Sequence, residues 1–120
     1  MTALAALSGF AGVAAGAFGA HGAADPMAKT LLKTGAEYEL IHTLAVFAAL
    51  AAPGRMARTA AWLFLVGGAL FGASLYLLVL TGVRALGVIT PLGGLLLLAG
   101  WLALAYAAVQ QGSATQSDGR

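Results

Sequence analysis

Two long stretches of this chain carry no formal charge, and they constrain its fold more than any other feature. They run from Ala60 to Val83 and from Ala85 to Gln111, and only Arg84 separates them. The hydrocarbon core of a bilayer is about 30 Å thick, and a helix of about 20 apolar residues crosses it at about 1.5 Å per residue. Each stretch meets that length. The sequence therefore predicts an integral membrane protein. Its function should depend on the few polar groups that lie within the bilayer.

The composition agrees with a membrane environment. Hydrophobic residues make up 61% of the 120-residue chain and charged residues 8%, whereas a soluble domain carries about 25% charged residues. The net charge of +2 is spread thinly, so we expect no nucleic-acid partner and take the lipid bilayer as the main one. The absence of cysteine excludes disulfides, thiolate metal sites and a cysteine nucleophile.

Apolar segments and turn signals predict an all-α fold, an integral membrane four-helix bundle. Asp25-Pro26 is typical of a helix start, with Asp25 as the N-cap and Pro26 in the first turn, and Pro53-Gly54 is typical of a turn. We expect one transmembrane domain, 1–112, followed by a polar tail, 113–120. The expected spans are about 2–21, 37–52, 59–82 and 86–109.

A short interfacial amphipathic helix is expected between spans 1 and 2, over about 26–36. Lys29, Lys33 and Glu37 recur every four residues and so share one helix face. This helix can run directly into the second span, whose purely apolar part is short. Three spans with a re-entrant segment is the alternative.

Two interpretations are open for the first apolar segment, and two for the orientation of the protein in the membrane. A signal peptide has a basic n-region, but no Lys or Arg precedes Lys29, so we interpret this segment as a retained membrane helix. Arg55 and Arg58 lie in a very short loop, which favours both termini in the cytoplasm of a multi-pass inner (plasma) membrane protein. The Lys and Arg residues divide evenly between the two sides, as in a dual-topology protein.

Small residues recur at helical spacing along the predicted spans. In lipid, helices associate through close packing of small residues and through interhelical hydrogen bonds. Such stripes serve either packing within one bundle or a seam between subunits of a homo-oligomer, and both are possible here. The candidate packing residues are Ser8, Gly12, Gly16, Ala20, Gly68, Gly72, Gly93 and Gly94.

Ionisable residues within a membrane are candidates for function. If spans 1 and 2 are antiparallel neighbours, several polar residues should lie together in one layer at a membrane face. It serves either as a proton- or ion-responsive site, since histidine titrates near neutral pH, or as interfacial anchoring. The cluster comprises His21, Asp25, Glu37, Tyr38, Glu39, His42 and Arg84.

Metal and catalytic chemistry find little support in the sequence. Glu39 and His42 form one Glu-x-x-His pair, half of the site that di-iron bundles build from several helices. Only one copy occurs, so a full site would need a symmetric oligomer. No nucleophile with a base and an orienting group is evident, so we assign no catalytic residue, no metal and no cofactor.

Three blocks of sequence resemble the YgdD/YwdK-type family of small bacterial membrane proteins, a domain of unknown function with eukaryotic transmembrane relatives. They are Gly16-Ala17-Phe18-Gly19-Ala20-His21-Gly22, Thr34 to His42, and Ser74 to Trp101 with Gly87-Val88-Ile89-Thr90-Pro91 at its centre. Glu37 and Glu39 are more acidic than the family pattern. The resemblance implies an inner-membrane protein with four spans and supplies no reaction.

Two functions are therefore expected. The first is a non-enzymatic membrane protein that acts by self-assembly or as an accessory or scaffold subunit of a membrane-protein partner. The alternative is an oligomeric conduit for a small solute, an ion or protons, with His21, Glu39 and His42 at its mouth.

Overall fold

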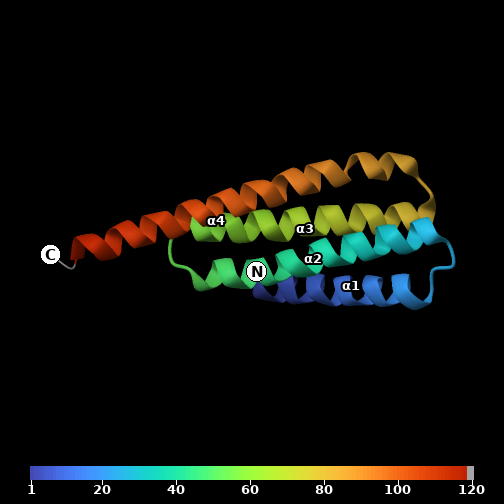
Figure 1. Ribbon diagram of the computed structural model, residues 1–120, viewed down its shortest axis with the longest axis horizontal. Coiled ribbons are helices and arrows are strands. Elements are labelled where there is room, and N and C mark those ends of the chain that lie inside the picture. Colours follow the sequence, from blue (N-terminus) through green and yellow to red (C-terminus); the bar gives the residue numbers. More distant parts are fainter. Residues whose placement is uncertain (119–120) are drawn as a thin grey trace.

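The computed structural model describes residues 1–118, and side chains through Ser113, as an antiparallel array of long helices (Figure 1). The helices are α1 (Thr2–His21), α2 (Pro26–Ala51), α3 (Arg55–Thr81) and α4 (Thr90–Asp118), with a short 3-10 helix, η1 (Arg84–Val88), before α4. The α1–α2 and α3–α4 connections lie at one end of the bundle and the α2–α3 turn at the other. Among the described residues no strand occurs, which confirms the predicted all-α class.

The helix ends follow the local chemistry of the sequence. The Asp25 carboxylate accepts a hydrogen bond of 2.7 Å from the Ala28 N–H, and Pro26 occupies the first turn of α2, as predicted. Gly54 precedes α3 with φ +101°, and Gly82 ends it with φ +69°, conformations that favour glycine. Pro91 is the second residue of α4, where its missing N–H costs no helical hydrogen bond.

Helix boundaries differ from the apolar segments at three places. One continuous helix, α2, covers both the predicted interfacial helix and the second span. Helix α3 begins at Arg55, because Gly54 turns the chain and nothing in Arg55–Arg58 opposes a helix. Helix α4 continues to Asp118, through most of the predicted polar tail, and residues 119–120 of that tail lie outside the described residues.

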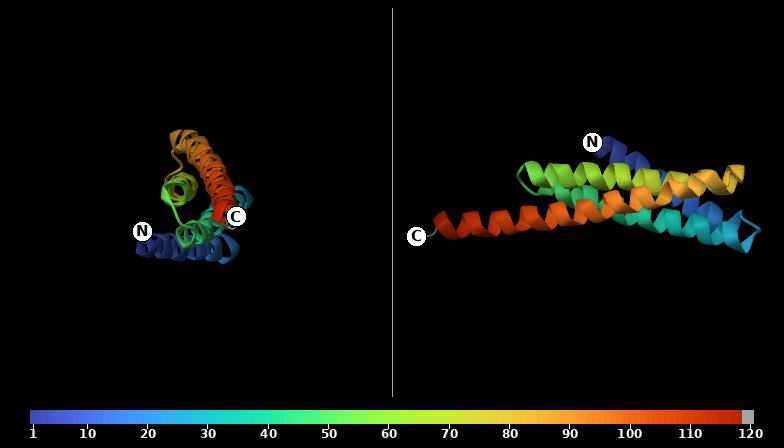
Figure 2. Two further views of the ribbon diagram at one scale, coloured as in Figure 1. Left: turned by 90° about the vertical axis from the view of Figure 1, so that its left-hand side faces the viewer. Right: turned by 90° about the horizontal axis from the view of Figure 1, so that it is seen from above.

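Helices α2 and α3 form the centre of the bundle. Helix α1 packs mainly on α2, and α4 packs on α3; seen end-on, α1 and α4 lie on different sides (Figure 2). The fully buried side chains of Val46 and Phe64 lie in a core completed by Ala5, Ala45, Ala49, Ala60, Ala61, Leu65 and Leu97. Helix α1 crosses the others obliquely, so its first half diverges from the axis of α3 (Figure 2).

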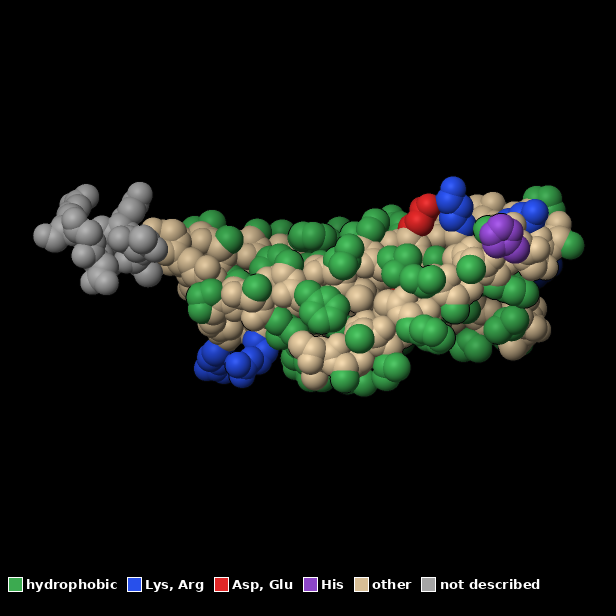
Figure 3. All heavy atoms as spheres, turned by 90° about the horizontal axis from the view of Figure 1, so that it is seen from below, with side chains coloured by type: hydrophobic (Ala, Val, Ile, Leu, Met, Phe, Trp, Pro, Cys, Tyr) green, Lys and Arg blue, Asp and Glu red, His purple; other side chains and the backbone are tan. Residues whose placement is uncertain are grey.

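Three segments are long and apolar enough to cross a membrane: Thr2–His21, Arg55–Thr81 and Arg84–Ser113. Helix α2 falls outside this group because its charged and polar residues, among them Glu37, Glu39 and His42, lower its hydropathy. On the face seen in Figure 3, the charged side chains gather towards the two ends, and an uncharged band lies between them. This distribution matches a bilayer around the middle of the bundle.

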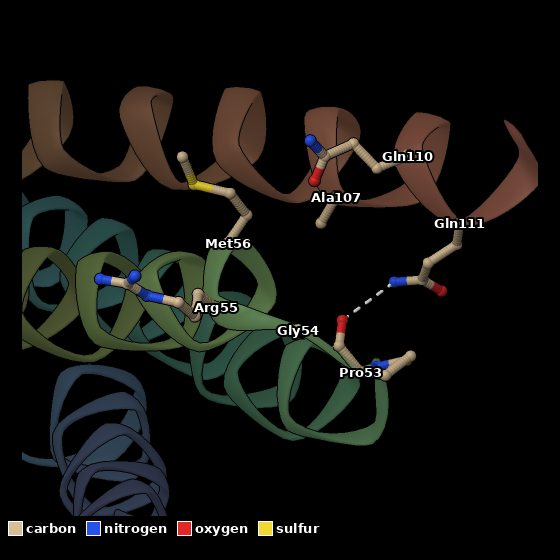
Figure 4. A pocket seen from close by; sticks show the side chains of 7 residues that line it. All are labelled: Pro53, Gly54, Arg55, Met56, Ala107, Gln110 and Gln111. Atoms are coloured by element: carbon tan, nitrogen blue, oxygen red, sulfur yellow. Dashed lines mark hydrogen bonds between the residues drawn. The ribbon is translucent and has the colours of Figure 1, made fainter. Parts of the chain in front are cut away.

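Helix α4 reaches past the α2–α3 turn at the end of the bundle. There the Gln111 side-chain N–H₂ donates a hydrogen bond of 3.2 Å to the Pro53 carbonyl (Figure 4). A shallow pocket of about 240 Å³ lies beneath this contact, lined also by Met56 and Ala107. The contact fastens α4 to the turn and brings no chemically reactive group into the pocket.

Candidate functional site

Glu39 is the buried acidic residue at the middle of the bundle. It lies thirteen residues after Pro26 and twelve before Ala51, the two ends of α2, which places it about 18–20 Å from each end at about 1.5 Å per residue. Its side chain is 4% exposed. Ser8 Oγ of α1 donates to its Oε1 at 2.6 Å, and Tyr76 Oη of α3 donates to its Oε2 at 2.7 Å. One carboxyl group thus links three helices.

Two glycines make room for this arrangement. A Cβ at Gly72 of α3 would lie 2.7 Å from Glu39 Oε2, and one at Gly35 of α2 would lie 2.6 Å from the Tyr76 ring. Any side chain at either position would displace the carboxyl group or the phenol. The two glycines therefore allow α2 and α3 to enclose Glu39.

His42, one turn further along α2, joins the second half of the bundle. Its Nδ1 lies 2.6 Å from the Tyr38 carbonyl, and its Nε2 accepts a hydrogen bond of 3.1 Å from the indole N–H of Trp101 in α4. The ring also contacts Phe64 of α3, with centroids 5.7 Å apart. Glu39 and His42 together connect α2 to each of the other three helices.

The predicted polar layer is divided in the structure. His21, Asp25 and Arg84 lie at the end where α1 meets α2 and α3 meets α4, and all three are exposed. Glu39 and His42 lie at mid-bundle instead, because α2 begins at Pro26 and Glu39 therefore faces Ser8 of α1, not His21. The expected single layer at a membrane face is not formed.

The other members of the predicted cluster have local partners. Asp25 caps α2, and exposed Glu37 pairs with Lys33 at 3.8 Å. Tyr38 stacks on Phe71 with ring centroids 4.5 Å apart, and it offers His42 its backbone carbonyl, not its hydroxyl. These contacts give Glu37 and Asp25 structural explanations at the surface.

The small residues singled out in the sequence lie mostly against neighbouring helices of the same bundle. A Cβ at Gly12 would meet Leu40, one at Gly16 would meet Ala36, and one at Gly68 would meet His42. Gly93 approaches the α3 backbone at Phe71, whereas adjacent Gly94 has space, with the Phe71 ring 4.0 Å away. Ala20 is exposed and lines a pocket of about 340 Å³ with Lys29 and Lys33.

The chemistry available at this site is that of a carboxyl group and two hydroxyls. Among the described residues no group of three or more His, Cys, Asp or Glu could hold a metal ion. The described ion pair does not involve Glu39. A buried carboxyl group outside the described ion pair is suited to binding a cation.

Sequence reasoning did not find three of the residues that complete the site. Tyr76 and Trp101 are absent from the predicted polar cluster, yet they donate to Glu39 and His42. Trp62, also absent from that cluster, lines a cleft that reaches Glu39. The glycines at 35 and 72, opposite the bulky Tyr76, were the available signal, but pairing them requires the helix register.

The family model for "Protein of unknown function (DUF423)" matches residues 15–94. The UPF0382 membrane protein YwdK of Bacillus subtilis is 37% identical over 82 residues, 64% of this chain and 67% of that protein. The UPF0382 inner membrane protein YgdD of Escherichia coli is 38% identical over 85 residues, 66% of this chain and 63% of that protein.

A UPF0382 membrane protein of Staphylococcus haemolyticus is 58% identical over 45 residues, and this alignment spans 37% of its length. No solved structure matches.

The fold and the buried polar site define an all-α membrane protein built from four long helices. The chain belongs to the DUF423 family of proteins of unknown function. The resemblance to the YgdD/YwdK-type family is thereby confirmed. The prediction of a membrane protein is also confirmed, and one of the relatives is named an inner membrane protein.

Proposed function

We propose that this protein is a non-enzymatic inner-membrane subunit that, as part of an oligomeric assembly, conducts protons or a small solute past Glu39. The observation that supports this function is the position of Glu39, buried at mid-bundle and hydrogen-bonded by Ser8 and Tyr76. An ionisable group in the hydrocarbon region is costly, and in membrane proteins such groups mark ion and proton pathways.

Assembly is part of the proposal because one subunit encloses little space. Phe64, Val46 and Leu97 fill the centre of the bundle. The cleft that reaches Glu39 lies between α1 and α3, on the side of the bundle. A route across the membrane therefore needs a second subunit to complete it.

The test is flux through liposomes that contain purified protein. We expect proton, alkali-cation or small-anion flux above the protein-free level for the wild type, and background flux for Glu39→Gln. Glu37→Gln is the matched control, because it makes the same change two residues away at an exposed site. Background flux for all three proteins and every ion tested would contradict the proposal.

A second candidate function is an accessory or scaffold subunit that conducts nothing. It is supported by the broad apolar surfaces of the outer helices, such as Phe10 of α1 and Leu102 of α4, each 74% exposed. In mild detergent the protein should then run as a defined complex larger than its own 11.9 kDa chain. Phe10→Ala should weaken that complex, and a strictly monomeric wild type would exclude this function.

A further inference from the structure

A cleft of about 630 Å³ opens between the first half of α1 and the middle of α3, with α2 beneath it. Its volume lies within the range of about 300–1,000 Å³ typical of small-molecule sites. The walls are apolar apart from Ser8 and Glu39; they comprise Leu4, Leu7, Trp62, Leu65, Val66, Ala69, Leu70 and Ala73. Helix α1 crosses α3 obliquely along this side of the bundle (Figure 2).

Glu39 places an acceptor without a counter-ion in this cleft. Ser8 and Tyr76 each donate to one of its two oxygens, and an ionised carboxylate accepts about four hydrogen bonds. Acceptor capacity therefore remains for a donor or cation that enters the cleft. A carboxylate that is enclosed by apolar walls without a counter-ion is stabilised by a cation that enters the cleft.

Trp62 gives the cleft a second cation-attracting feature. Its side chain is 47% exposed and lines the same space as Glu39. The face of an indole ring attracts cations, most strongly where water is excluded. A carboxyl group, an aromatic wall and an otherwise apolar lining together favour an apolar molecule that carries one positive charge.

We propose that the cleft binds a lipophilic monovalent cation, a protonated amine or an onium ion on an apolar body, in exchange for the proton of Glu39. This inference rests on the proposed function and gives it a substrate class. Each cation that binds converts the Glu39 acid into a carboxylate and releases one proton, so the charge of the site is conserved. The bulky apolar body occupies the space between the α1 leucines and the α3 wall.

Glu39 is the group that exchanges the proton, because the neighbouring titratable groups have other partners or donate to it. Ser8 faces it from α1, and Tyr76 is the titratable group that faces it from α3. On α2, His42 is engaged by Trp101 of α4, and Glu37 pairs with Lys33 at the surface. The mid-bundle depth of Glu39 also places it away from phospholipid headgroups, which lie at the membrane surfaces.

The probe is tetraphenylphosphonium, titrated calorimetrically into the full chain in detergent. We expect saturable binding to the wild type, release of one proton per cation, and tighter binding as pH rises. Glu39→Gln should weaken binding by about tenfold or more, about 1.4 kcal/mol, and abolish proton release. Glu37→Gln should stay within about twofold of the wild type, as surface substitutions usually do.

Tetraphenylborate, an anion of similar shape, separates charge recognition from simple hydrophobic binding. We expect it to bind far more weakly than the phosphonium ion. Equal affinity for the two ions, or equal phosphonium affinity in the wild type and Glu39→Gln, would overturn the proposal. A wild-type dimer that binds neither ion and shields Trp62 from quenchers would assign the cleft to a second copy of the chain and would also overturn it.

Ala73→Phe keeps the test decisive if Glu39→Gln fails to fold. Ala73 is an exposed residue of the cleft wall, so a phenyl ring there should fill the space, leave Glu39 intact and remove binding. Retention of full affinity in Ala73→Phe would contradict the site. Phosphonium binding without liposome flux would reject the conduit and support the cation site. Glu39-dependent flux without phosphonium binding would support the conduit and reject the cation site.

Discussion

At the scale of residues, His42 has both ring nitrogens committed by its neighbours. A carbonyl oxygen only accepts, so the contact with Tyr38 places a proton on Nδ1. An indole N–H only donates, so the contact with Trp101 requires a bare Nε2. His42 is therefore a neutral imidazole in the tautomer with hydrogen on Nδ1, and it ties α2 to α4.

This tautomer is directly measurable. In protein labelled with ¹⁵N-histidine, NMR at neutral pH should show a protonated Nδ1 and an unprotonated Nε2 for His42. Trp101→Phe removes the donor and should shift the Nε2 signal, whereas Trp62→Phe, which lies in the cleft wall, should leave it in place. A protonated Nε2 in the wild type would contradict the Trp101 contact.

The sequence indicated Glu39 and His42 as a pair on one helix, and the structure places both within the bundle. Their partners could not be predicted in the same way. Ser8, Tyr76 and Trp101 lie 31, 37 and 59 residues away from the groups that they contact. Helical spacing relates residues within one helix, but it does not fix how one helix lies against another.

At the scale of helices, glycine sets how closely α3 and α4 approach. A Cβ at Gly93 would lie 2.7 Å from the Phe71 backbone nitrogen and 2.9 Å from the Gly67 carbonyl oxygen. Backbone atoms cannot rotate away as a side chain can, so such a contact would push the helices apart. Gly94 is the next residue of the same helix, yet a Cβ there would lie 4.0 Å from its nearest neighbour, the Phe71 ring.

These two glycines form a matched pair for mutagenesis. Gly93→Ala should destabilise the bundle by about 1–3 kcal/mol, as overpacking does. Gly94→Ala should be neutral or stabilise by up to about 1 kcal/mol, because alanine is the better helix former. Reversible unfolding in mixed detergent micelles measures both, and equal effects would refute the close approach at Gly93.

The helix ends show which elements the sequence could predict. Asp25-Pro26 and Pro53-Gly54 act through local capping and turn chemistry, so the α1–α2 and α2–α3 connections were predictable. The sequence allowed the interfacial helix to run directly into the second span, but apolar content could not decide this, because Glu39 and His42 lower the hydropathy of α2. In the folded chain these side chains have hydrogen-bond partners on the neighbouring helices.

At the scale of the whole molecule, the account depends on whether α2 carries Glu39 through the bilayer. Helices α1, α3 and α4 have the length and hydropathy to span, and α2 lies antiparallel between α1 and α3. Both termini then face the same side, which we propose is the cytoplasm because Arg55 and Arg58 lie beside the α2–α3 turn. The alternative, a re-entrant α2, would return both of its ends to one side.

The most direct measurement is the side of the membrane on which each end of α2 lies. The chain has no cysteine, so Ala24→Cys and Ala51→Cys, at exposed positions beside the two ends of α2, each introduce a unique thiol. With a membrane-impermeant maleimide, we predict that Ala24→Cys is labelled in intact cells and that Ala51→Cys is labelled only after the membrane is opened. Labelling of both thiols from the same side would contradict the account, since Glu39 would then lie on a helix that never crosses the membrane.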